Sequence, residues 1–95
     1  MNIKKEILKI LLKYISLDSH QVFLFGSRAT NNTKKWSDYD IGIKGQQKLS
    51  YATLSKIEGD LEESDIPYKV DIIDLNRVSQ KFLKLALKNK QQWIT

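Results

Sequence analysis

Apolar residues recur along this 95-residue chain at two different spacings, which predict helices and strands in turn. In residues 3–16 they recur every three or four positions with lysines on the other side, as in an amphipathic helix. Shorter and more continuous apolar runs, such as residues 22–25, are typical of buried strands. The pattern predicts helix, strand, short helix or loop, strand, helix, strand and helix at 3–16, 21–25, 28–36, 38–44, 48–63, 66–74 and 76–90.

The order of these segments predicts a small mixed sheet covered by helices. The first strand ends at Ser27 and the second begins at Asp38, so these strands should run antiparallel if the two residues are to meet. The helix that follows the second strand allows a parallel crossover to the third. We therefore expect an α/β (α+β) fold with about three strands, built as one domain over residues 1–95. The side chains expected to face its core from the first two long helices are Ile3, Ile7, Leu11, Tyr14, Ile15, Leu49, Leu54, Ile57 and Leu61.

The last predicted helix is apolar over nearly half of its circumference. At about 100° per residue, one stripe along it is basic and consists of Arg77, Lys81, Lys84 and Lys88. The apolar residues expected to face the core are Val78, Phe82, Leu85 and Ala86. Leu83 and Leu87 lie far around from Val78, so the helix is either deeply packed or faces a partner on its second side. We favour a partner, bound through Leu83, Lys84, Leu87 and Lys88.

The composition argues against several classes of protein. There is no cysteine, so neither a disulfide framework nor a thiolate metal site can form. No apolar run approaches the roughly 18 residues of a membrane span. The lysines of the first helix fit a helix that covers a sheet better than one that lies on a membrane surface. The N-terminus also lacks the uninterrupted apolar core of a secretory signal. We therefore expect a cytoplasmic protein that does not contact a membrane.

The net charge of +5 is distributed unevenly. Residues 1–35 carry a net +5, residues 36–76 a net −5 and residues 77–95 a net +5. Basic ends of this kind suit nucleic acid, but no zinc finger and no aromatic-rich RNA-binding strand accompanies them. A solvated basic surface explains the charge equally well, so nucleic acid stays an alternative that we do not favour.

Three aspartates lie in the second and third predicted strands. Asp38 and Asp40 are two positions apart and therefore share one face of a strand. Asp71 interrupts a run of valine and isoleucine, where an unpaired carboxylate costs on the order of several kcal/mol, so we expect it to have a partner such as a metal ion. Singly, such residues are more often caps or solvated edges. Together they suit Mg²⁺, which prefers oxygen ligands, and they could hold two ions about 3.5–4 Å apart for phosphoryl-type displacement.

A Gly-Ser pair at the end of the first strand supplies a second element of the site. Gly26 permits a tight turn and a close approach of the backbone. Ser27 can cap a following helix, whose free N–H groups would point at a phosphate. Such a pair alone is usually only a turn. Ten residues before an Asp-x-Asp pair, it predicts a site for a metal-bound nucleoside triphosphate.

The segments Gly26–Ala29 and Ser37–Gly42, followed by Asp71 on a later strand, resemble the nucleotidyltransferase superfamily related to DNA polymerase beta. The small size resembles the minimal nucleotidyltransferases, or MNT proteins, and the resemblance covers nearly the whole chain. It implies a Mg²⁺-dependent enzyme, with two ions, that uses ATP.

The same resemblance implies a role for each site residue. Asp38 and Asp40 would bind metal and bridge it to the triphosphate. Asp71 would complete the second metal site and help to deprotonate the acceptor hydroxyl. The Gly26-Ser27 turn would cradle the terminal phosphates, with pyrophosphate as the leaving group. Arg28 would either neutralise phosphate charge or only cover the helix.

Minimal members of this family are commonly paired with a small all-helical protein of the HEPN type, and such pairs can be toxin–antitoxin systems. The resemblance implies that this chain is the antitoxin and transfers AMP from ATP to the toxin. Because the chain ends at Thr95, we expect another chain to position the acceptor. A non-catalytic module that neutralises its partner by occlusion, or nucleotidyl transfer to RNA, are the alternatives. Three converging carboxylates favour the enzyme, while the base and the acceptor stay open.

Overall fold

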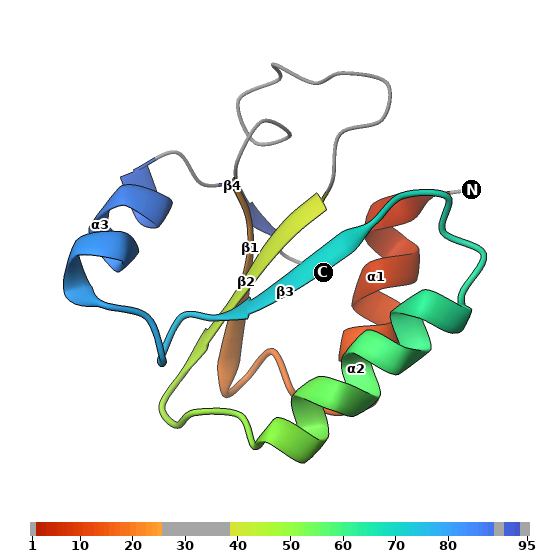
Figure 1. Cartoon of the computed structure of the whole chain (residues 1–95), viewed down its shortest axis with the longest axis horizontal. Coiled ribbons are helices and arrows are strands. Elements are labelled where there is room, and N and C mark those ends of the chain that lie inside the picture. The colour runs from red at the N-terminus through yellow and green to blue at the C-terminus, as the bar shows by residue number, and fades with distance from the viewer. Residues whose placement is uncertain (1, 26–38, 89–90, 94–95) are drawn as a thin grey trace.

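A computed structural model describes residues 2–25, 39–88 and 91–93 of the chain (Figure 1). Its elements in chain order are α1 (Ile3–Leu11), β1 (His20–Phe25), β2 (Tyr39–Gly45), α2 (Tyr51–Glu63), β3 (Val70–Asp74), α3 (Gln80–Lys88) and β4 (Gln91–Trp93). The strands form one sheet in the order β3-β2-β1-β4. The β1–β2 and β1–β4 pairs are antiparallel, whereas β2 and β3 run parallel.

The expected fold class is confirmed, as are the directions of the first three strands. The short strand β4 adds to them, at the edge beside β1. Four boundaries move by three residues or more. The first helix ends at Leu11 and not at residue 16, and the second begins at Tyr51 and not at residue 48, because Ser50 caps it. The third strand begins at Val70 and not at residue 66, because Pro67 has no N–H to give to a ladder. The last helix begins at Gln80 and not at residue 76.

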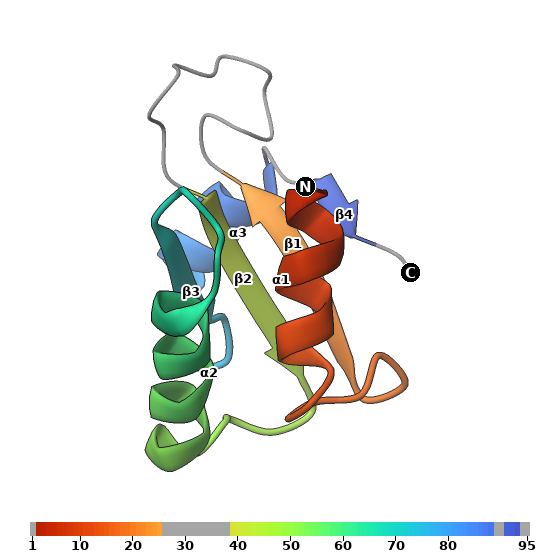
Figure 2. The ribbon, with the colours of Figure 1, turned by 90° about the vertical axis from the view of Figure 1, so that its right-hand side faces the viewer.

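The sheet separates two apolar clusters of different size. Helices α1 and α2 cover one face, and α3 lies against the other (Figures 1 and 2). The larger cluster lies under α1 and α2, and its fully buried members include Ile7, Leu11, Ile41 and Ile57. All nine side chains expected to face the core from the first two helices lie in or against this cluster. None of the helices that the structure describes is long and apolar enough to cross a membrane.

The later start of α3 follows from a turn built on the buried carboxylate of Asp74. Asp74 accepts hydrogen bonds from the backbone N–H groups of Leu49, at 2.9 Å, and Asn76, at 3.0 Å. Its Oδ2 is also 3.3 Å from Nε of Arg77, whose Nη2 donates to the carbonyl of Leu49 at 2.6 Å. Arg77 therefore ties this turn to the start of α2 and is not part of a basic stripe on α3. The hydroxyl of Ser79 then accepts from the N–H of Phe82 and caps the helix.

The expected orientation of the last helix is wrong. Leu83, expected to face a partner, packs with Val78 against the second cluster of Phe23 and Leu75. Phe82 and Leu85, expected in the core, are instead 41% and 62% exposed. Val78 precedes the helix that begins at Gln80, so its direction does not set the phase of the helical residues. Leu83 therefore belongs to the core. The expectations for Ala86, in the core, and Leu87, at a partner, concern side chains outside the described part of the structure.

We expect Leu83→Ala to lower the free energy of unfolding by roughly 1–3 kcal/mol, because it removes a half-buried side chain from a small cluster. Leu85→Ala, the matched control, should cost less than about 0.5 kcal/mol because Leu85 is mostly exposed. Urea unfolding of both variants measures the difference. Equal losses, or a larger loss for Leu85→Ala, would contradict this orientation of α3.

A polar contact joins the turn that follows α1 to α2. The hydroxyl of Tyr14 donates to Oδ2 of Asp60 at 2.6 Å, and Nζ of Lys13 lies 3.4 Å from the same oxygen. The hydrogen bond from Tyr14, helped by the charge of Lys13, lowers the pKa of Asp60. Accepting from the tyrosine in turn, Asp60 raises the pKa of Tyr14. The contact thus requires an ionised Asp60 and a protonated Tyr14.

We expect Tyr14→Phe to be less stable than the wild type at neutral pH, by an amount that disappears at both pH extremes. As pH falls through the lowered pKa of Asp60, the carboxylate is protonated in the folded state and its contribution is lost. As pH rises past about 10 and through the raised pKa of Tyr14, the tyrosine ionises and the contribution is lost again. Thermal unfolding of both proteins across pH measures the window. Asp60→Asn should remove the acid limit, and an unchanged limit would rule out this carboxylate as its cause.

Candidate active site

The register of the sheet brings two of the predicted aspartates together. Asp40 of β2 is the direct partner of Asp71 of β3 in a parallel pair. Neighbouring strands lie about 4.8 Å apart, and paired residues project to the same face. The two carboxylates therefore leave adjacent strands side by side, which is the arrangement that the sequence predicted for them.

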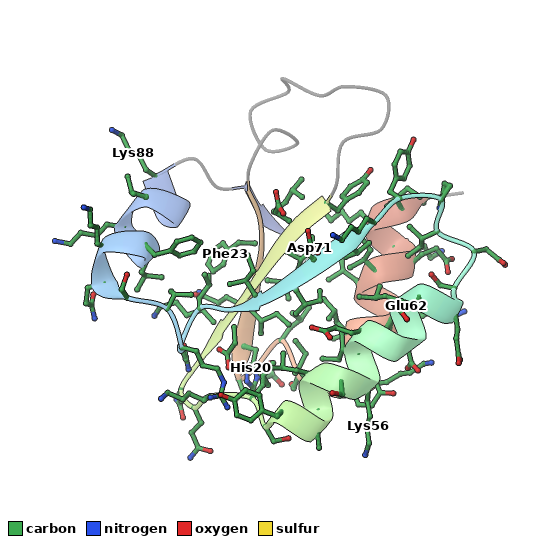
Figure 3. The ribbon with its side chains drawn as sticks, viewed as in Figure 1. His20, Phe23, Lys56, Glu62, Asp71 and Lys88 are labelled. Carbon is green, nitrogen blue, oxygen red and sulfur yellow. The ribbon has the colours of Figure 1, made fainter. Side chains whose placement is uncertain are left out.

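Both carboxylates lie on the face of the sheet against which α3 packs. Ile73, two residues after Asp71, packs against the cluster of Phe23 and Leu75 on that face. Tyr39, the neighbour of Asp40, packs on the opposite face with the larger cluster. Figure 3 shows Asp71 on β3 with the sheet beneath it. The pair is thus placed beyond the end of the apolar cover and not inside the core.

Solvent and a lysine both reach the site. The side chain of Asp71 is 41% exposed, and its Oδ1 lies 3.8 Å from Nζ of Lys69. The sequence analysis expected a partner such as a metal ion for Asp71, which stays a prediction, and Lys69 is the ionic partner that the described residues provide. A cavity of about 340 Å³ borders the same residue along the outer side of β3, with Glu58 and Glu62 of α2 on its wall. A group that approaches Asp71 therefore meets a polar, open environment.

The remaining predicted site residues lie outside the described residues. These are Gly26, Ser27, Arg28 and Asp38. Phe25 immediately precedes Gly26 in the sequence, and it pairs with Asp40 across β1 and β2. In the sequence, both predicted motifs are therefore attached to the end of the sheet where Asp40 and Asp71 meet.

The described carboxylates suit a hard cation but do not complete a site for one. No three histidine, cysteine, aspartate or glutamate side chains gather closely enough to hold a metal within the described ranges. Two adjacent carboxylates are nevertheless the usual protein contribution to Mg²⁺, which takes its other ligands from water and substrate phosphates. Repulsion between such neighbours also favours a cation beside them. Asp40 and Asp71 therefore fit this ion, and Asp38 is the third carboxylate in the sequence.

Lys69 is a residue of the site that the sequence analysis missed. It precedes β3 by one position, and its carbonyl accepts a hydrogen bond of 2.9 Å from the N–H of Tyr39. That bond extends the parallel pair to the start of β2. The signal was present, since Lys69 and Asp71 stand two apart and so share one face of an extended chain.

A mixed sheet with two carboxylates on adjacent central and edge strands, and helices on both faces, is the architecture of a nucleotidyltransferase domain. The chain belongs to the family described as "Polymerase beta, Nucleotidyltransferase", whose sequence model matches residues 5–94. Among curated proteins, the Haemophilus influenzae "Probable protein adenylyltransferase MntA" is 32% identical over 91 residues. The match covers 93% of this chain and 79% of that protein.

Solved structures show the same fold. A crystal structure of a toxin–antitoxin with AMP-PNP superposes with a TM-score of 0.79 at 24% identity, over 100% of this chain and 75% of that one. The structure of the tri-AMPylated Shewanella oneidensis HEPN toxin in complex with MNT antitoxin gives a TM-score of 0.71 at 22% identity, over 97% and 70%.

We expect Asp40→Asn and Asp71→Asn to fold normally without metal, with a change in unfolding free energy within about 0.5 kcal/mol. Each variant removes charge repulsion, and the ion pair that Asp71→Asn loses is a largely exposed one of small energy. Stabilisation by added Mg²⁺ should be lost in both. Thermal unfolding with and without MgCl₂ measures this, with the exposed Asp65→Asn as control. Full Mg²⁺ stabilisation in both site variants would exclude them as ligands.

Proposed function

We propose that this chain is a Mg²⁺-dependent adenylyltransferase that transfers AMP from ATP to a protein of the HEPN type and thereby acts as an antitoxin. The observation that carries the proposal is the pairing of Asp40 with Asp71 at one end of the sheet. Membership of the nucleotidyltransferase family supports the reaction class. The naming of the Haemophilus influenzae relative supports a protein acceptor.

Each residue then has a role in the reaction. Asp38 and Asp40 would hold Mg²⁺ next to the triphosphate, and Asp71 would complete the site. When bound, the ion supplies charge neutralisation for the phosphates. The Gly26-Ser27 turn binds the terminal phosphates, with Arg28 as a further source of positive charge. The acceptor hydroxyl forms a bond to the α-phosphorus, Asp71 takes up its proton, and the bond to the β-phosphate breaks to release pyrophosphate.

The choice of ATP and of a HEPN-type acceptor comes from the relatives. One similar structure contains AMP-PNP, an ATP analogue, and another contains an AMPylated HEPN toxin with an MNT antitoxin. A cytoplasmic location stays a prediction from composition. Neutralisation by occlusion is the second candidate, because α3 presents exposed Phe82 and Leu85 that the fold does not use.

We expect label from α-labelled ATP, but not from GTP, CTP or UTP, on a purified HEPN-type protein. Asp40→Asn and Asp71→Asn should reduce labelling to background, since each removes a carboxylate of the metal site. The control Asp65→Asn should label at the wild-type rate. Gel autoradiography measures the label for each protein variant in reactions that contain the partner, RNA or neither.

Two outcomes would overturn this assignment. Label on RNA and none on protein would make the chain an RNA nucleotidyltransferase. If Asp40→Asn suppresses the partner's toxicity as well as the wild type does, neutralisation is by occlusion and catalysis is not needed for it.

A further inference from the structure

The face of the sheet that carries Asp40 and Asp71 also carries exposed apolar side chains that the fold does not use. Phe82 and Leu85 of α3 are 41% and 62% exposed. They are three positions apart and therefore neighbours on the helix surface. Leu83 fixes α3 to Phe23 and Leu75. At about 100° per residue, Leu85 therefore lies nearly opposite this contact, and Phe82 lies to its side. Such side chains on the outside of a small domain indicate a binding surface.

Lysines surround this apolar pair. Lys81, Lys84 and Lys88 are exposed on α3, and no acidic residue occurs after Asp74 in the sequence. Lys88 extends from α3 away from the sheet in Figure 3. A shallow groove of about 400 Å³ continues the surface past the start of α3, with Lys44 and Lys48 on its wall and Leu75 and Leu83 among its apolar residues. The surface has an apolar centre and a basic rim.

The charge of the rim selects the occupant. A symmetric contact between the α3 helices of two copies would bring lysines against lysines, because no acidic side chain occurs on α3 to pair with them. Single-stranded nucleic acid fits poorly as well. Its bases stack on successive aromatic side chains, whereas α3 pairs the aromatic Phe82 with the aliphatic Leu85. An acidic protein surface with apolar residues at its centre matches both features, because complementary charge at a rim steers association while the apolar centre supplies affinity.

We propose that α3 is the docking site for the protein that accepts the nucleotide, with Phe82 and Leu85 as apolar anchors and Lys81, Lys84 and Lys88 as a rim for acidic side chains. The inference rests on the proposed function. Its geometric basis is that α3 and the carboxylate pair share one face of the sheet. A protein held on α3 therefore lies on the face of the sheet that carries both carboxylates. We call the five named residues the α3 surface.

The test is isothermal titration of this chain with the purified HEPN-type protein used in the labelling reactions. We expect Phe82→Ser and Leu85→Gln each to weaken binding on the order of tenfold, as for truncated anchors at the centre of an interface. Leu12→Gln is the matched control, because Leu12 is 43% exposed but follows α1 on the opposite face. Its dissociation constant should stay within about twofold of the wild type.

Charge reversal tests the rim separately. Lys84→Glu and Lys88→Glu should slow association and flatten its dependence on salt. Lys56→Glu, an exposed lysine on α2 that extends away from the sheet in Figure 3, should change neither. Binding of Mg²⁺ and ATP should be unchanged in every variant, because the α3 surface is separate from the carboxylates.

Wild-type affinity in both Phe82→Ser and Leu85→Gln would overturn the α3 surface, as would an equal loss in Leu12→Gln. A wild-type dimer that these variants convert to monomer would assign the surface to a second copy. RNA binding that is lost on lysine reversal, with protein binding unchanged, would assign it to nucleic acid. If docking behaves as expected but no variant or wild type transfers AMP, the surface stands and the proposed reaction falls.

Discussion

The parallel register of β2 and β3 is the constraint on which the candidate site depends. It places Asp40 opposite Asp71 and, two residues further along, Gly42 opposite Ile73. A slip of one residue would turn every side chain of β3 to the other face. Asp71 would then project into the cluster under α1 and α2, and Ile72 would take its place beside Asp40. The hydrophobic pattern of β3 therefore fixes the chemistry, because burial of Val70 and Ile72 leaves Asp71 only one direction.

Two carboxylates of the same strand show how strongly surroundings decide a role. Asp74 is almost fully buried, and two backbone N–H groups and Arg77 satisfy it. It joins the end of β3 to the segment just before α2, and both of its oxygens are engaged in these contacts. Asp71, three residues earlier, is half-exposed, and its salt bridge within the described residues is a 3.8 Å contact with the exposed Lys69. Hydrogen bonding makes the first a structural residue, and exposure leaves the second available for chemistry.

The sheet and the pairing of the site could be predicted because they follow from local patterns. Strand periodicity located β1 and β2, and the spacing of Ser27 and Asp38 indicated their antiparallel course. A parallel crossover from β2 to β3 was then enough to place Asp71 next to Asp40. The face presented by α3 could not be predicted in the same way, because Asp74 and Arg77 build a turn from contacts with residues far away in sequence. Once Val78 falls outside the helix, the sequence alone no longer says which side is inward. Strand β4 was missed because three residues are too few to show a period.

The place of β3 at the rim of the sheet has a consequence for the durability of the site. Within the part of the chain that the structure describes, β3 pairs with β2 alone, whereas β2 is held on both sides. A strand with one ladder opens more readily than a central one, so its amide hydrogens exchange by local fraying. Asp71 moves with that strand. The two carboxylates are therefore held together by the ladder between an edge strand and its neighbour. Heat or denaturant would open this ladder, and separate the carboxylates, before the domain itself unfolds.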